Sequence, residues 1–217
     1  MNSFASLIIG LILSAVLVSA DADDKLAAPF HSQPAVDVSV GGLDMTNRDE
    51  LRKPPLTIEC WARLHEATAF NIIVASDPKI SSQNWVLYTE LKTGNFAFYT
   101  NAMDHGTGPH RVFVSDTPIC DDAWHYLAVI YESGRARLYV DGKMIEDVAL
   151  PPQQGSPTDG DIAVGQLVEG GNGVALGCNG LIQDVRISKG VRNITGMPSA
   201  PFQKDATTLE LWPLNKT

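Results

Sequence analysis

The sequence predicts an all-β protein built as a two-sheet antiparallel sandwich. Roughly a dozen short runs are rich in aliphatic and aromatic residues, and Gly, Pro, Asn and Asp stand at the junctions between them. Several runs alternate apolar and polar residues with the period of two that strands require. The best helical candidate is the short stretch 45–53, and no fixed repeat period points to a propeller or solenoid.

The strands begin near residue 35. Residues 36–40 alternate valine with polar residues, and residues 56–64 place Leu, Ile, Cys and Ala in one phase. Pro54-Pro55 marks the start of this second strand, because proline bars a helix from entering it. Further β-rich runs follow at 71–76 and 85–91.

Tight turns organise the middle of the chain. Thr93-Gly94 reverses it into a strand in which Phe96 and Phe98 share a face. In WHYLAVIYESGRARLYVDGK (124–143) both phases of the first strand are apolar, which is the behaviour of a central strand covered on both faces. Ser133-Gly134 and Asp141-Gly142 supply the two turns, since glycine accepts positive φ.

The remaining strands lie near 143–150, 161–167, 180–188 and 209–214, with no composition break between them. We therefore predict one domain over residues 35–214. Its core should contain the apolar residues that share a phase on their strands: Leu56, Ile58, Cys60, Phe96, Phe98, Leu138, Val140 and Ile182.

The charge balance excludes some partners. The chain carries 16 Lys+Arg against 25 Asp+Glu, a net charge of -9. Nucleic acids and anionic membrane surfaces select clustered cations, so neither is expected as the main partner.

Residues 1–22 are typical of a secretory signal. Leu7 to Val18 is apolar but too short to span a bilayer, and small residues and then acids follow it. Cleavage fits after Ala20 or Ala22, and the alternative is an uncleaved anchor. Residues 23–34 would form a loose lead-in, and the protein would be secreted or periplasmic, without membrane insertion after signal removal.

Five segments in order resemble the laminin G-like (LamG-like) jelly roll of the concanavalin A-like lectin/glucanase superfamily: LTIECWARL, DDAWHYLAVIY, ARLYVDGK, GLIQDVRIS and LELWPL. The resemblance spans roughly Ala35 to Leu214. It implies two antiparallel sheets, one of them curved, with the first and last strands near each other. It also implies a glycan or an extracellular protein as partner, often with calcium.

The chain departs from these relatives where calcium would bind. Relatives often carry Asp-Glu where this chain has Gln183-Asp184. The corresponding loops offer Gln83, Asn84 and Glu169 as oxygen ligands. Calcium takes six to eight oxygens including several carboxylates, so this supply is thin.

Catalytic patterns are absent from the sequence. Superfamily glycosidases need two carboxylates on one strand face, and no Glu-x-Asp or comparable pair occurs on the expected strands. Asp104, His105 and His110 lie together in a Gly-rich stretch that has zinc-ligand chemistry, and the alternative is a solvated turn-forming loop. We therefore predict a protein that is not an enzyme.

Aromatic and polar loop residues are the candidate ligand contacts. Trp61, Trp124 and Trp212 lie in the resembling core motifs and are expected to pack inside. Trp85 and Tyr99 are candidates for stacking on sugar rings, with packing as the alternative. We expect binding by the loops around Asn84-Trp85, Asp104-His105 and Glu169–Asn172.

Three cysteines allow at most one internal disulfide. Cys60 is in phase with core residues and is expected to stay reduced, whereas Cys120 and Cys178 each lie just before a strand. If the domain has one bridge, it should join Cys120 to Cys178, and three free thiols are the alternative.

Two classes of function remain open. The first is an exported module that binds carbohydrate without catalysis, and the second is an extracellular protein-interaction or adhesion module. Exposed aromatics with amides on the concave face favour sugar, whereas a broad apolar patch favours a protein.

Overall fold

The computed structural model describes residues 29–30, 35–45, 48–76, 81–101, 111–150, 160–168 and 175–214. Strands dominate this part of the chain, and its one helical turn is the 3-10 helix η1 (Asp49–Leu51), inside the stretch predicted as helical. The all-β prediction is confirmed. The predicted signal segment, residues 1–22, lies outside the described residues.

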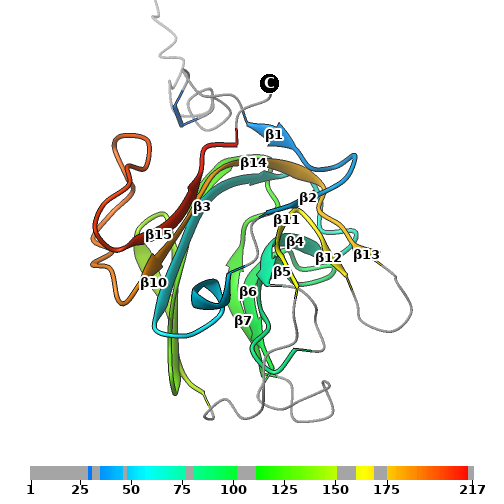
Figure 1. Ribbon diagram of the computed structural model, residues 1–217. Helices are drawn as coiled ribbons and strands as arrows, with labels where there is room; N and C mark the ends of the chain where they lie inside the picture. Colours follow the sequence, from blue (N-terminus) through cyan, green and yellow to red (C-terminus); the bar gives the residue numbers. More distant parts are fainter. Residues whose placement is uncertain are drawn as a thin grey trace, which may run out of the picture.

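The larger sheet has seven strands in the order β1-β14-β3-β8-β9-β10, with β15 also pairing to β14. All of its pairs are antiparallel. Figure 1 shows its long strands β14 and β3 arching over the smaller sheet. Its strands are β1 (Val36–Asp37), β3 (Leu56–Leu64), β8 (Trp124–Glu132), β9 (Arg135–Val140), β10 (Lys143–Ala149), β14 (Gly180–Lys189) and β15 (Thr208–Trp212).

The smaller sheet has six strands in the order β2-β11-β4-β5-β6-β7, also antiparallel, and a separate hairpin joins β12 to β13. The strands are β2 (Leu43–Asp44), β4 (Asn71–Ser76), β5 (Trp85–Thr89), β6 (Asn95–Thr100), β7 (Arg111–Pro118), β11 (Ile162–Val164), β12 (Leu167–Val168) and β13 (Ala175–Leu176).

The first and last strands meet on one edge of β14. β1 pairs with Leu181 and Ile182, and β15 pairs with Val185 to Ser188, so the two strands lie end to end. This is the closeness of first and last strands that the resemblance implied.

The turn chemistry predicted for residues 124–143 is confirmed. β8 lies between β3 and β9 inside the larger sheet. Gly134 has a φ of +97°, and Asp141 and Gly142 have φ values of 52° and 75° at the turn between β9 and β10. Two consecutive positive φ values match the hairpin turn that twisted antiparallel strands favour.

The core lies between the two sheets, and every residue predicted for it is buried there. Cys60 is among them, as its phase on β3 requires. The opposite phase of β3 and β8 is covered as well: Trp61, Trp124 and Tyr126 pack with Phe202 from the segment that links β14 to β15. Buried aromatic area of this kind contributes strongly to stability, and Trp61 and Trp124 pack inside the protein as expected.

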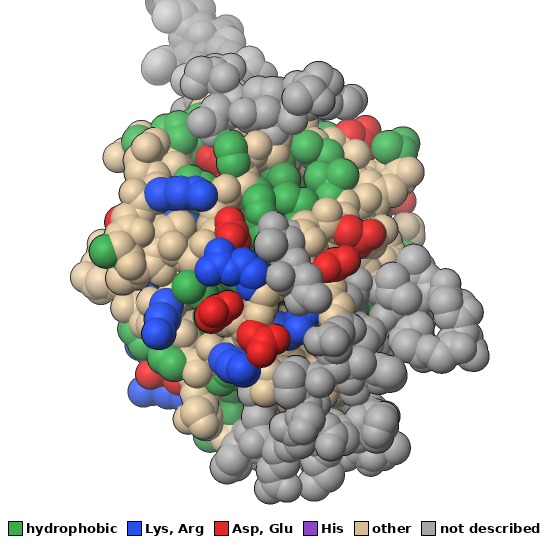
Figure 2. All heavy atoms as spheres, viewed as in Figure 1, with side chains coloured by type: hydrophobic (Ala, Val, Ile, Leu, Met, Phe, Trp, Pro, Cys, Tyr) green, Lys and Arg blue, Asp and Glu red, His purple; other side chains and the backbone are tan. Residues whose placement is uncertain are grey.

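Charged side chains do not gather by sign on the face shown in Figure 2, where basic and acidic groups are interspersed. Arg48 pairs with Glu210 at 2.5 Å, and Lys53 pairs with Asp49 at 3.2 Å. This face therefore lacks a broad cationic surface. Within the described ranges, no helix has the length and apolarity needed to cross a membrane.

Candidate functional site

The outward face of the six-stranded sheet is the first candidate surface. Alternate residues of β4, β5 and β6 point away from the core and form a second apolar cluster, which consists of Ile72, Ala75, Val86, Tyr88, Ala97, Tyr99 and Leu167. Phe70 and Leu176 pack against this cluster. Because Leu167 and Leu176 belong to β12 and β13, the β12–β13 hairpin covers part of this face.

Tyr99 lies on this outward face, opposite its core-facing neighbour Phe98, which is the side predicted for it. It is only 8% exposed, and its hydroxyl donates a hydrogen bond of 2.5 Å to Oδ1 of Asn101. Its ring is therefore held in place, and its polar end lies beside an amide.

Trp85 does not lie on the outward face, and the sugar-stacking prediction for it is wrong. It is 0% exposed, shares its phase with Leu87, and packs between the sheets. Its indole N–H donates to the carbonyl of Leu51 at 3.1 Å, which satisfies the one polar atom of the ring. The run WVLYT is apolar in both phases, so its alternation alone cannot show which phase faces inward.

Asn84 is buried at the end of β5, where the chain enters the strand. Its Nδ2 donates to the carbonyl of Ser76, and its own carbonyl accepts from the backbone N–H of Asn101 at 3.2 Å. Among the described residues, the side-chain oxygens Asn84 Oδ1 and Gln83 Oε1 are buried without a hydrogen-bond partner. Both were predicted as ligand atoms, and a buried oxygen without a partner costs free energy that a bound group would recover.

These two oxygens do not by themselves fit calcium. Calcium binding needs several carboxylates among its six to eight oxygens, and both atoms here are amide oxygens. The described part of the chain holds no cluster of three His, Cys, Asp or Glu residues suited to a metal ion. Glu169, Asp104, His105 and His110 lie outside the described residues.

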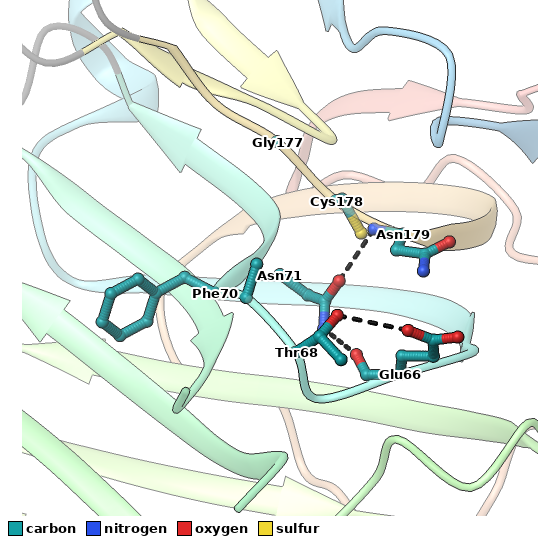
Figure 3. Close-up of a pocket in the computed structure, with 8 residues that line it drawn as sticks. Glu66, Thr68, Phe70, Asn71, Gly177, Cys178 and Asn179 are labelled. Atoms are coloured by element: carbon teal, nitrogen blue, oxygen red, sulfur yellow. Dashed lines mark hydrogen bonds between the residues drawn. The ribbon is translucent and has the colours of Figure 1, made fainter. Parts of the chain in front are cut away.

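A second candidate site, which the sequence did not predict, lies at the other end of the same sheet (Figure 3). A pocket of about 220 Å3 opens between the segment from Glu66 to Asn71 and the segment from Gly177 to Asn179. Asn71 joins the two segments. Its Nδ2 donates to the carbonyl of Glu66 at 2.8 Å, and its Oδ1 accepts from the backbone N–H of Asn179 at 2.7 Å.

Two basic side chains near this pocket share one carboxylate. Arg63 and His65 both bind Asp122, at 2.9 Å and 2.6 Å. Hydrogen bonds from these two side chains lower the pKa of Asp122 to about 2. Asp122 is therefore ionised at neutral pH, and it binds both Arg63 and His65.

The three cysteines lie toward this end of the sandwich. Asn71 Nδ2 is 3.5 Å from Cys120 Sγ, and Cys178 lines the pocket. All three are free thiols in the structure, so the bridge expected between Cys120 and Cys178 is absent from it and stays a prediction. Burial raises the pKa of Cys178 to about 12, so this thiol is protonated at neutral pH.

The comparisons with known proteins agree with this architecture. The family model of the concanavalin A-like lectin/glucanases superfamily, in its laminin G form, matches residues 39–195. The chain belongs to this superfamily. A search of curated proteins finds no match.

Solved structures with the superfamily fold resemble most of this chain at low identity. A putative carbohydrate-binding protein from Bacteroides ovatus is 13% identical with a TM-score of 0.65, and the match covers 84% of this chain but about half, 52%, of that one. The CBM40 of the Ruminococcus gnavus IT-sialidase, bound to α2,3-sialyllactose, is 13% identical with a TM-score of 0.58, over 76% of this chain and 97% of that one.

A third similar structure is domain 4 of AbnA, an extracellular GH43 arabinanase from Geobacillus stearothermophilus, in complex with arabinotriose. It is 18% identical with a TM-score of 0.53, over 73% of this chain and 75% of that one. At these identities the likeness establishes the fold.

Proposed function

We propose that this chain is an exported, non-catalytic carbohydrate-binding module. The proposal rests on three aromatic rings of the outward face: Tyr88 and Tyr99, 7% and 8% exposed, whose hydroxyls lie beside polar groups, and the half-buried Phe70, which packs on Tyr88. The hydroxyl of Tyr99 donates to Asn101, and that of Tyr88 donates to Glu90 at 3.3 Å. Aromatic faces with oriented polar neighbours are the combination that recognises a ring with apolar C–H faces and hydroxyl edges.

The superfamily relatives support the same function. The similar structures are named as a carbohydrate-binding protein, a CBM40 with a bound sialyllactose and an arabinanase domain with arabinotriose. Export rests on residues 1–22, with cleavage after Ala20 or Ala22, and the binding domain would span residues 35–214.

The absence of catalysis rests on the carboxylates of the described strands. None of these strands carries two carboxylates at positions two apart, and Glu146 and Asp147 of β10 are adjacent and therefore point to opposite faces. A glycosidase of this fold needs both carboxylates directed into one cleft.

For the ligand, we propose contacts at the β5–β6 end of the outward face. Tyr99 and Asn84 lie there in the described part, and Asp104 and His105 follow β6 in the sequence. Because Asn84 is 0% exposed, it would act by holding the backbone of Asn101, which in turn orients the hydroxyl of Tyr99.

The test is a glycan array probed with the purified protein, followed by calorimetric titration of each hit and assay of the same glycans for hydrolysis. Saturable binding without hydrolysis is the expected result. Hydrolysis of a bound glycan would overturn the non-catalytic assignment, and an array without hits would overturn carbohydrate binding.

One observation favours a protein partner as the second candidate. The edge strand β7 exposes Val112 at 46% and Val114 at 39%, on the same outward face. An exposed apolar edge strand is a common place for another chain to add. An extracellular protein that binds the wild type but not Val112→Lys, with an empty glycan array, would establish this alternative.

A further inference from the structure

The pocket between the Glu66–Asn71 segment and the Gly177–Asn179 segment has the donors, acceptors and charge of a small ligand site. Figure 3 shows the carboxylate of Glu66 and the side-chain amide of Asn179 on facing sides of the space between the two segments. The segments come from distant parts of the sequence. They are joined by the hydrogen bond from the backbone N–H of Asn179 to Oδ1 of Asn71 at 2.7 Å and by one from the backbone N–H of Ile72 to the carbonyl of Gly177 at 2.9 Å.

The two facing side chains are oriented by their neighbours. Thr68 donates its hydroxyl proton to Oε2 of Glu66 at 3.2 Å, and Ser39 donates to Oδ1 of Asn179 at 3.2 Å. These contacts leave Oε1 of Glu66 as an acceptor and Nδ2 of Asn179 as a donor for a ligand. Neighbouring hydroxyls on one molecule can each donate and accept, so they match such a facing pair.

Three further lining residues add little polar surface to the pocket. Cys178 contributes its protonated thiol, and Gly177 contributes backbone only. Phe70, which also lines the pocket, points its ring away from Glu66 and packs on Tyr88, with ring centroids 6.1 Å apart. Phe70 thereby links the lining of the pocket to the apolar cluster of the outward face.

The charge of the lining selects among ligands. Glu66 is the one ionisable carboxylate, and neither lysine nor arginine is among the lining residues. Arg63, at the end of β3, is paired with Asp122 at 2.9 Å. An anionic sugar would meet a carboxylate and no cation among the lining residues, which disfavours binding.

We propose that this pocket is a subsite for one residue of a neutral saccharide, with Glu66 accepting from and Asn179 donating to neighbouring ring hydroxyls. The proposal rests on the carbohydrate-binding function proposed above. It adds a location at the opposite end of the outward face from Asn84, and it assigns the ligand to neutral rather than sialylated glycans.

The experiment titrates arabinotriose, cellotriose, maltotriose and α2,3-sialyllactose into the full-length protein by calorimetry, after the array. Three variants are compared with the wild type. Glu66→Ala removes the acceptor, Asn179→Asp replaces the donor by a like charge, and Glu50→Ala removes an exposed carboxylate on η1 as the matched control. Glu66 and Glu50 are both exposed, so their replacement leaves folding intact, which the melting temperature checks.

We expect a neutral trisaccharide to bind the wild type and Glu50→Ala equally. Its affinity should fall at least about tenfold in Glu66→Ala and in Asn179→Asp, because a charged partner and a donor in a partly desolvated site are lost. Glycan binding that both variants leave unchanged would overturn the subsite while the proposed function stands. Tighter binding of α2,3-sialyllactose than of the neutral sugars would overturn the ligand class, and an array without hits would overturn the proposed function itself.

Discussion

Asp184 is a carboxylic acid that folding removes from water. It occupies the bulge between Gln183 and Val185 on β14, with a φ of 45°, and it is 2% exposed. Burial raises its pKa from 3.8 to about 6, and a hydrogen bond from the backbone N–H of Phe202 opposes this rise. The charged form of Asp184 is therefore unfavourable in the folded protein.

The raised pKa sets the direction of a pH effect. The folded state binds the proton more tightly than the unfolded state, so the wild type loses stability as pH rises from about 4 to about 6. A rise of about two units in the pKa of Asp184 corresponds to a loss of roughly 3 kcal/mol in the free energy of unfolding. The effective dielectric of a protein interior reduces this contribution, so we expect about 1–3 kcal/mol.

Asp184→Asn removes the titration and keeps an oxygen that can accept from Phe202. Asparagine also tolerates a positive φ. The free energy of unfolding of the variant minus that of the wild type should rise by about 1–3 kcal/mol between about pH 3.5 and pH 7.5. Any effect of the amide that is independent of pH cancels in this comparison.

Urea unfolding at successive pH values measures this difference, and Asp161→Asn, at an exposed position, controls for the loss of one negative charge. A difference that stays constant or falls as pH rises would show that folding does not raise the pKa of Asp184.

Other predictions follow from packing and from the thiols. Gly142→Ala should destabilise by about 2 kcal/mol or more in urea unfolding, because a β-carbon at this φ of 75° would lie 2.3 Å from the backbone of Gly196; a neutral effect would contradict the turn geometry. Trp85→Ala should lower the free energy of unfolding by about 3–5 kcal/mol, as expected for a buried core ring. A decrease below about 1 kcal/mol would mean that Trp85 is not in the core. Any single internal bridge that glutathione disulfide forms should join Cys120 to Cys178, seen as a loss of two hydrogens in the mass of the unreduced protein; a bridge that includes Cys60 would show the pairing to be wrong. Adding calcium should leave the melting temperature unchanged, and a clear rise would show that residues outside the described ranges complete a site.

The sandwich could be predicted because strand period and turn chemistry are local properties. The alternation in β3 and β6 placed Ile58, Cys60, Phe96 and Phe98 in the core, where the structure has them. Asp141-Gly142 specifies a hairpin through φ values that few other residue pairs adopt.

The candidate sites were harder to predict because they depend on which strand face is turned inward. Trp85 lies in a run that is apolar in both phases, so only the packing of the two sheets decides its direction. The pocket of Glu66 and Asn179 joins segments that are distant in sequence, and neither segment contains a motif. The asparagine that opens NIIVAS is the one local signal of this pocket, because a polar residue at the start of an apolar strand needs partners. The side chain of Asn71 finds them in Glu66, Thr89, Cys120 and Asn179.

The most direct test of carbohydrate binding is the glycan array followed by calorimetric titration, run with and without calcium and with Glu66→Ala beside the wild type. We expect saturable, calcium-independent binding of a neutral oligosaccharide that is not hydrolysed and that binds at least about tenfold more weakly to Glu66→Ala. An array without a single bound glycan, under both conditions, would contradict it.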